Sequence, residues 1–198
     1  MQMLERVEQL AVVQKKEWGE ILTDFEQRNK YRVFGPDGQE MFRALETGGA
    51  FLTRFFLRSW RPFEMTLTTP EGTCVLQLRR PFKFFFTEIH VADANGRKLG
   101  HVQRCFSFLR RLYAVFDATG RETHQLYGPL LHPWTFEVRQ HDRTLGKIGK
   151  RWGGMLREGF TDADSFGVAF PAGADAATKA VLLGATFLID FAHFESGR

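Results

Sequence analysis

The residues in this chain best suited to binding chemistry are arginines and lysines interleaved with aromatic rings. They fall in three clusters, of which the first is Arg54, Phe55, Arg58, Trp60 and Arg61, the second is Arg79, Arg80, Lys83, Phe84 and Phe86, and the third runs from Arg104 to Arg111. Cations beside apolar rings suit an anionic lipid surface, where each cation contributes about 1 kcal/mol. Ordinary strand alternation, with Phe in the core and Arg in water, produces the same pattern, so both interpretations stand. Nucleic acid is a disfavoured partner. The chain has only three Tyr, and its net charge of +4 is too small for the strongly basic groove that single strands bind.

The residues that usually carry catalysis are not arranged as an enzyme would need them. None of the four serines lies in a Gly-x-Ser-x-Gly elbow, and the chain contains no glycine-rich phosphate loop. The six histidines are scattered, without Cys or Glu at zinc-ligand spacing. The sequence therefore predicts a protein that is not a hydrolase, a transferase or a redox enzyme.

Length and composition indicate one globular domain over residues 1–198, with residues 1–9 as a disordered or helical lead-in. The 43% hydrophobic and 25% charged residues exclude a disordered chain or a multi-span membrane protein. We find no signal peptide, so we expect a cytoplasmic protein in which Cys74 and Cys105 stay as free thiols.

The segment from Tyr31 to Lys150 predicts five successive β-hairpins. Each unit is a short alternating run, a turn and a second short run, and four of the turns contain a glycine. These glycines are Gly38, Gly72, Gly96 and Gly120. Alternation of apolar and polar residues along the runs predicts antiparallel strands with one face in a core and one face in water.

The C-terminal segment predicts a helix that begins after Asp175, a suitable N-cap. It is apolar on all sides, and its expected buried residues are Val181, Leu182, Leu183, Phe187, Leu188, Ile189 and Asp190. A helix of this kind is either buried or membrane-spanning. Its apolar part rises only about 20 Å against about 30 Å of hydrocarbon, so we expect burial. Hairpins followed by such a helix predict a β-barrel closed around it.

Three segments closely resemble the phospholipid scramblase family and follow one another in the same order as in that family. They are residues 146–152, 156–171 and 179–191, and a weaker match continues upstream to about Leu10. The resemblance implies the tubby-like fold shared with LURP-one-related proteins. That fold is a mainly β structure, an antiparallel barrel of about twelve strands closed around a C-terminal helix. It makes residues 10–13 the first strand.

The resemblance also implies a calcium segment, which corresponds here to residues 162–175. Asp162, Asp164 and Asp175 are its candidate Ca²⁺ ligands. Ca²⁺ prefers six to eight oxygen ligands, yet Phe166 and Gly173 occupy positions where a loop of the EF-hand type needs oxygen side chains. The alternative is that Asp162 and Asp164 cap a turn and that Asp175 caps the helix.

The activity implied by the resemblance is calcium-stimulated movement of phospholipids between bilayer leaflets, by a protein bound peripherally to the anionic inner face of a membrane. In many family members the segment matching residues 83–86 is rich in acylated cysteines. Phe stands there in this chain, so any anchoring is expected to be non-covalent. The alternative is a soluble, non-catalytic scaffold that binds a protein partner and moves no lipid.

Overall fold

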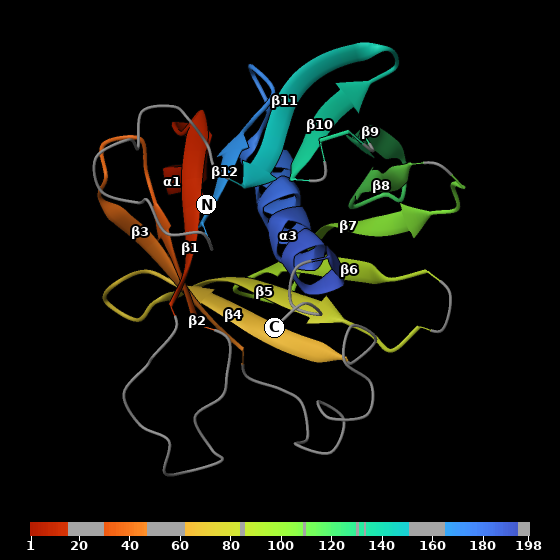
Figure 1. Cartoon of the computed structure of the whole chain (residues 1–198). Helices are drawn as coiled ribbons and strands as arrows, with labels where there is room; N and C mark the ends of the chain where they lie inside the picture. Colours follow the sequence, from red (N-terminus) through yellow and green to blue (C-terminus); the bar gives the residue numbers. More distant parts are fainter. Residues whose placement is uncertain are drawn as a thin grey trace, which may run out of the picture.

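The twelve strands of the computed structural model form one closed antiparallel barrel (Figure 1). The structure describes residues 1–15, 30–46, 62–83, 86–108, 110–129, 131–132, 134–150 and 165–193. The described residues contain two helices, α1 (Gln2–Glu5) before the first strand and α3 (Ala176–His193) after the last. The strands are β1 (Gln9–Lys15), β2 (Lys30–Phe34), β3 (Glu40–Glu46), β4 (Phe63–Thr68), β5 (Cys74–Arg80), β6 (Glu88–Asp93), β7 (Lys98–Cys105), β8 (Arg111–Asp117), β9 (Glu122–Gly128), β10 (Thr135–Gln140), β11 (Arg143–Lys150) and β12 (Ser165–Ala169).

The barrel closes through β1, which pairs with β2 on one side and with β12 on the other. Val12 lies opposite Val33 of β2 and opposite Phe166 of β12. Every other strand pairs with its neighbours in the sequence, so each backbone edge is covered. The predicted twelve-stranded antiparallel barrel around a C-terminal helix is therefore confirmed, as is the strand at residues 10–13.

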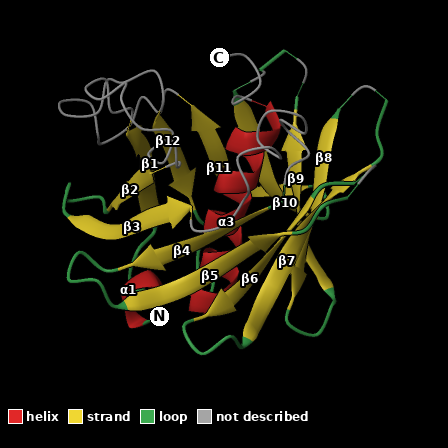
Figure 2. Cartoon of the chain, turned by 90° about the horizontal axis from the view of Figure 1, so that it is seen from below, coloured by secondary structure: helices red, strands yellow, loops and turns green. Residues whose placement is uncertain are grey.

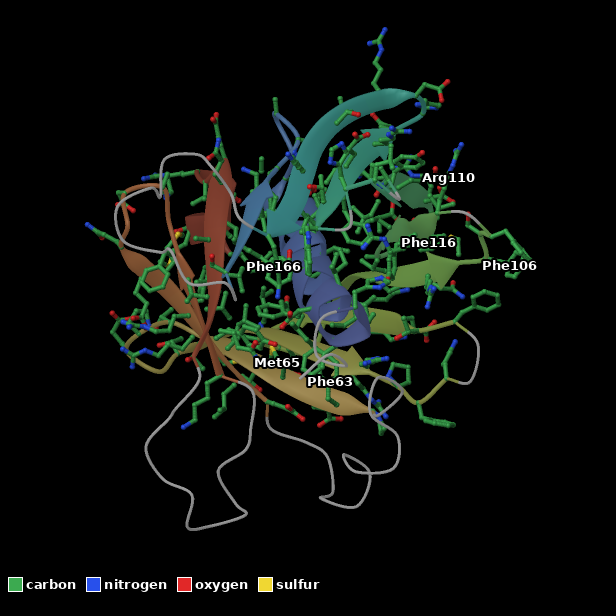
Figure 3. All side chains as sticks on the ribbon, in the orientation of Figure 1. Phe63, Met65, Phe106, Arg110, Phe116 and Phe166 are labelled. Carbon is green, nitrogen blue, oxygen red and sulfur yellow. The ribbon has the colours of Figure 1, made fainter. Side chains whose placement is uncertain are left out.

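Helix α3 runs through the barrel and fills its interior (Figure 2). The seven helix residues expected to be buried are all buried. Side chains on the inner faces of the strands pack around the helix, as Figure 3 shows for Phe63, Met65 and Phe166. Among the described residues, α3 alone is long and apolar enough to cross a membrane, but 78% of it is buried inside the protein. The prediction of a buried helix is confirmed.

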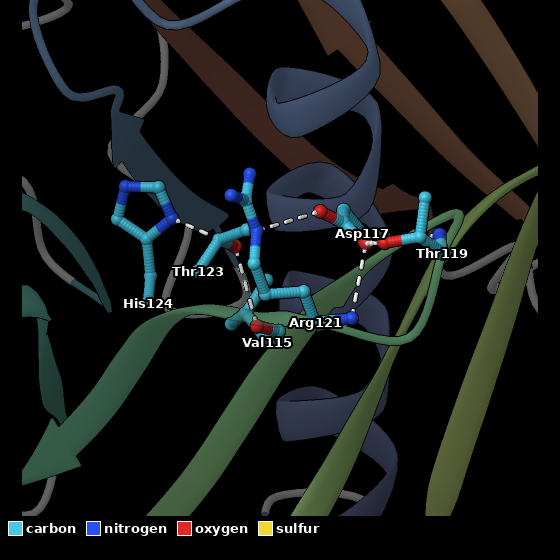
Figure 4. Close-up of polar contacts among 6 residues, drawn as sticks. All are labelled: Val115, Asp117, Thr119, Arg121, Thr123 and His124. Carbon is cyan, nitrogen blue, oxygen red and sulfur yellow. Dashed lines mark hydrogen bonds and ion pairs between the residues drawn. The ribbon is translucent and has the colours of Figure 1, made fainter.

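The four predicted turn glycines end tight hairpin turns. Gly38, Gly72, Gly96 and Gly120 all have positive φ, between 77° and 95°, a conformation that suits glycine. In the turn that joins β8 to β9, Asp117 accepts hydrogen bonds from the backbone of Thr119 and Arg121 (Figure 4). The Thr119 hydroxyl also donates to Asp117 and, with these backbone groups, lowers the pKa of Asp117 to about 2. Asp93 bonds to its own turn in the same way.

The two ends of the barrel differ in the length of their connections. One end, called here the turn end, carries the tight turns that join β2 to β3, β4 to β5, β6 to β7, β8 to β9 and β10 to β11. The opposite end, called here the loop end, carries the connections 81–87, 106–110 and 129–134. Helix α3 begins at the turn end, where Lys179 donates to the Glu5 carbonyl of α1 at 2.8 Å. It finishes at the loop end, beside the first residues of β4 and β8.

The two cysteines are free and half-buried, as expected. Cys74 lies at the start of β5 and Cys105 at the end of β7. Burial raises the pKa of the Cys105 thiol above its usual value, which opposes formation of a reactive thiolate. Cys105 therefore behaves as a small apolar side chain of the wall.

Gly100 of β7 allows the wall and helix α3 to approach closely. A Cβ at this position would collide with the Phe116 carbonyl oxygen and lie 2.8 Å from Val181 Cγ2. We predict that Gly100→Ala lowers the free energy of unfolding by about 2–3 kcal/mol, as for other overpacked cores. Gly149→Ala is the matched control, because its nearest contact would be 3.0 Å, to the Trp134 carbonyl oxygen. Equal losses in urea denaturation of the two variants would contradict this account of the packing.

Candidate functional site

Four of the ten residues predicted to form a lipid surface lie within the described structure, all around the end of β5. They are Arg79, Arg80, Lys83 and Phe86. The other six, Arg54, Phe55, Arg58, Trp60, Arg61 and Phe84, lie outside the described residues. Arg79 and Phe86 are exposed, as the prediction requires. Arg79 forms a loose ion pair with Glu64, 3.7 Å apart on the neighbouring strand.

Arg80 is buried, so the prediction that it belongs to an exposed lipid surface is wrong. Only 3% of the residue is accessible. It shares the inward-facing positions of β5 with Leu76 and Leu78. Its Nε donates to the Thr87 hydroxyl at 2.8 Å, and its guanidinium lies 5.8 Å from the ring centre of Phe63. Arg80 therefore holds the end of the 81–87 connection, at Thr87, and its buried guanidinium is out of reach of a membrane.

Lys83 forms an ion pair with a buried carboxylate, that of Glu88. Its Nζ lies 2.9 Å from Glu88 Oε2, and Nε2 of His90 lies 2.9 Å from the other oxygen of the same carboxylate. Burial by itself raises the pKa of Glu88, but the hydrogen bonds and charges of Lys83 and His90 outweigh it and hold this pKa below its usual value. Glu88 is thus ionised at neutral pH and neutralises part of the charge that Lys83 could offer to lipid.

Six large apolar side chains in the described connections of the loop end are exposed to solvent, and two of them, Leu131 and Trp134, lie outside the clusters found in the sequence. The six are Phe82 and Phe86 in the 81–87 connection, Phe106 and Phe108 in the 106–110 connection, and Leu131 and Trp134 in the 129–134 connection. In Figure 3 Phe106 projects away from the barrel, in contrast to Phe63 beside α3. Two signals in the sequence were available. Phe106 and Phe108 fall between two strands, and Leu131 lies between Pro129 and Pro133, which interrupt strand pairing.

The connections at the loop end are fixed to the barrel beneath them. Arg111 donates to the carbonyl oxygens of Pro129 and His132, both at 3.3 Å. The backbone N–H of Arg104 donates to the Thr87 carbonyl at 2.9 Å. These bonds link the start of β8 to the 129–134 connection and the end of β7 to the 81–87 connection. The exposed apolar side chains of the 129–134 connection, Leu131 and Trp134, are therefore carried on a supported base.

The last turn of α3 is joined to the wall at this same end by two tyrosines. The Tyr31 hydroxyl donates to Asp190 Oδ2 at 2.7 Å, and the Tyr113 hydroxyl lies 2.7 Å from His193 Nε2. Burial lowers the pKa of His193 to about 4, helped by the positive charges of Arg111 and Arg104. Burial raises the pKa of Tyr113 to about 12. The pair is therefore neutral at physiological pH.

Of the candidate calcium ligands, only Asp175 lies within the described structure, where it caps helix α3. Its Oδ1 accepts the backbone N–H of Thr178 at 2.8 Å, as the capping alternative predicts. Hydrogen bonds from the Thr178 hydroxyl and from the Thr178 backbone N–H lower the pKa of Asp175. Asp162 and Asp164 lie outside the described residues. Over the described part of the chain, no group of three or more His, Cys, Asp or Glu is placed to hold a metal ion.

Comparisons with known proteins show that the chain is similar to phospholipid scramblases. The family model described as Scramblase matches residues 1–196. Phospholipid scramblase 1 of Mus musculus is 34% identical over 98% of this chain and 63% of its own length. Phospholipid scramblase 2 of Bos taurus is 32% identical over the whole of this chain and 72% of its own length. An Arabidopsis thaliana protein of known structure covers 92% of this chain and 91% of its own, with 13% identity and a TM-score of 0.49.

The chain is shorter than its relatives. It spans between 62% and 66% of the length of the scramblase 1 proteins of Mus musculus, Homo sapiens and Rattus norvegicus. What those longer proteins do as a whole is therefore not transferred to this chain by similarity alone.

Replacement of Asp175 separates its capping role from its charge. We predict that Asp175→Ala lowers the free energy of unfolding by about 1 kcal/mol, because the Thr178 N–H loses its acceptor. Asp175→Asn keeps a capping oxygen and serves as the matched control, with a much smaller loss. Thermal denaturation of both variants checks this, and an equal loss would show that the carboxylate charge, not the cap, stabilises the helix.

His193 makes the stability of the protein depend on pH below neutrality. The unfolded chain binds a proton on this residue near pH 6.5, whereas the folded protein does so only near pH 4. The stability contributed by neutral His193 is therefore complete above pH 6.5 and declines as the pH falls to about 4, by about 3 kcal/mol. We expect urea denaturation to show a smaller decline between these pH values for His193→Gln than for the wild type. Parallel pH profiles would contradict burial of the neutral ring.

Proposed function

Because this chain belongs to the phospholipid scramblase family, we propose that it moves phospholipids between the two leaflets of a bilayer and that calcium stimulates this movement. In this proposal the protein binds peripherally to an anionic membrane surface on the cytoplasmic side. The observation that carries it is the family match over residues 1–196, almost the entire chain. It is a lipid-translocating protein in this reading, without a classical catalytic site.

The interior of the barrel limits where a lipid could travel. Helix α3 and the side chains around it fill the space inside the wall with apolar residues such as Phe187 and Leu188, both fully buried. A headgroup moving through this interior would lose its hydration, and buried polar groups such as Asp190 and Lys179 already have partners within the protein. We therefore place the lipid path outside the barrel, at a protein surface that meets the bilayer.

The second candidate is a soluble scaffold that binds a protein partner. The burial of α3 favours it, because the one described helix that could span a membrane is used as the core of the fold. The two candidates differ in what they require of lipid. A scaffold needs no contact with a bilayer, whereas a scramblase must bind it and must let labelled lipid cross it.

Reconstitution of the purified protein into vesicles that carry a fluorescent phospholipid tests the proposal. We expect the fraction of label accessible to an external quencher to rise above one half when protein and calcium are present, and to fall back toward one half with chelator. Asp175→Asn is the variant for the calcium arm, because it keeps the helix cap and removes one candidate ligand charge. Binding without lipid movement at any calcium level would contradict scrambling, and the absence of binding would favour the scaffold.

A further inference from the structure

The loop end of the barrel combines the most exposed apolar side chains of the described structure with cations. Phe108 is 92% exposed, Leu131 90%, Phe106 77% and Trp134 48%. The rings of Phe106 and Phe108 lie 6.3 Å apart, so they form one continuous apolar tip. A soluble protein gains nothing from holding such rings in water, and contiguous exposed apolar groups usually mark a contact surface.

Charge distinguishes the loop end from the turn end. The connections 81–87, 106–110 and 129–134 contain no Asp or Glu. Exposed Arg104 and Arg110 flank the two phenylalanines directly. The turns at the opposite end, by contrast, each carry a carboxylate, namely Asp37, Glu71, Asp93, Asp117 and Asp142. Two of these carboxylates are paired with arginines of their own turns, Asp93 with Arg97 and Asp117 with Arg121. An anionic partner is therefore attracted to the three described connections of the loop end rather than to the turns.

We infer that the barrel docks end-on to an anionic lipid bilayer, with the 106–110 and 129–134 connections inserted among the lipid headgroups. Apolar side chains at the tip with cations behind them match the order in which a bilayer presents its acyl boundary and its anionic headgroups. Trp134 suits this depth, because an indole ring favours the membrane interface. The bonds from Arg111 to Pro129 and His132 hold the 129–134 connection in place before docking.

Docking by this end also orients helix α3. Its last turn lies at the loop end, where Phe191 stacks on Phe63 with ring centres 4.1 Å apart and His193 contacts Tyr113. In the docked protein the C-terminal end of α3 faces the bilayer and its N-terminal end, beside α1, faces water. This surface is the one at which the proposed lipid movement would take place, so the inference rests on the proposed membrane function.

Vesicle co-sedimentation with two sets of variants tests the docking surface. We expect Phe106→Ser/Phe108→Ser to weaken partition to phosphatidylserine-containing vesicles at least tenfold, because two apolar side chains no longer enter the interface. Leu145→Ser is the matched control, since Leu145 is also exposed but lies near the turn end, and it should change partition less than about twofold. Arg110→Glu should weaken binding to anionic vesicles, while Arg143→Glu at the turn end should not.

Hydrogen exchange of the unmodified protein supplies a second measurement that does not depend on variants. With anionic vesicles we expect slower exchange in residues 106–110 and 131–134, and unchanged exchange in the turns at residues 93–97 and 117–121. Phosphatidylcholine vesicles should give little protection, and added salt should reduce the protection seen with anionic vesicles.

The outcomes separate failure of this inference from failure of the proposed function. If the wild type binds anionic vesicles and the Phe106/Phe108 variant binds equally well, another surface docks and the inference is wrong, while the membrane function stands. If the wild type binds no vesicle, the membrane function itself fails. If sedimentation velocity shows a wild-type dimer that the Phe106/Phe108 variant loses, and vesicle binding is unaffected, these side chains serve a second copy of the chain and the inference is overturned.

Discussion

The packing of one apolar helix inside a closed wall is the interaction on which the rest of this structure depends. Because α3 is apolar on every side, it needs a surrounding that is apolar on every side, and a twelve-stranded barrel supplies it. Tyr31 of β2 meets Phe187 edge to face, and Tyr113 of β8 contacts His193, so both halves of the wall contact the helix. Each fully buried side chain of this size contributes about 1.5–3 kcal/mol. Neither the wall nor the helix would keep its shape without the other.

A filled interior moves any binding function to the surface, and the antiparallel connections decide how that surface is divided. In two of the tight turns Asp stands at the first position, because its carboxylate accepts the backbone N–H groups of the turn, as Asp93 and Asp117 do. These two carboxylates are therefore at the turn end for reasons of folding. The loop end is free of that requirement, and there the described connections carry phenylalanine, leucine, tryptophan and arginine. The charge asymmetry between the two ends is thus partly a by-product of turn chemistry.

Local patterns in the sequence were sufficient to predict the strands and the helix, but they did not predict which single residues are exposed. Positive-φ glycines, strand alternation and the Asp175 cap are short-range signals, so the hairpins and the helix start could be predicted. Arg80 was misplaced because its cationic character suggested an exposed position, although it alternates in phase with the buried Leu76 and Leu78. Leu131 and Trp134 were missed for the opposite reason, since large apolar residues without neighbouring cations are expected in a core. Both cases depend on where a strand ends relative to the barrel, which is a long-range property.

The energetics of α3 decide between two ways in which this protein could meet a membrane. Insertion of the helix would carry Lys179 and Asp190 toward hydrocarbon, where a charge costs about 2.5–3.5 kcal/mol at the bilayer centre and less nearer the interface. Inside the barrel the same groups are satisfied, Lys179 by the Glu5 carbonyl and Asp190 by the Tyr31 hydroxyl. Extraction would also expose the inner face of the wall to water. The barrel is therefore the better environment for α3, and contact with lipid falls to side chains that are already exposed when the protein is folded, those of the loop end.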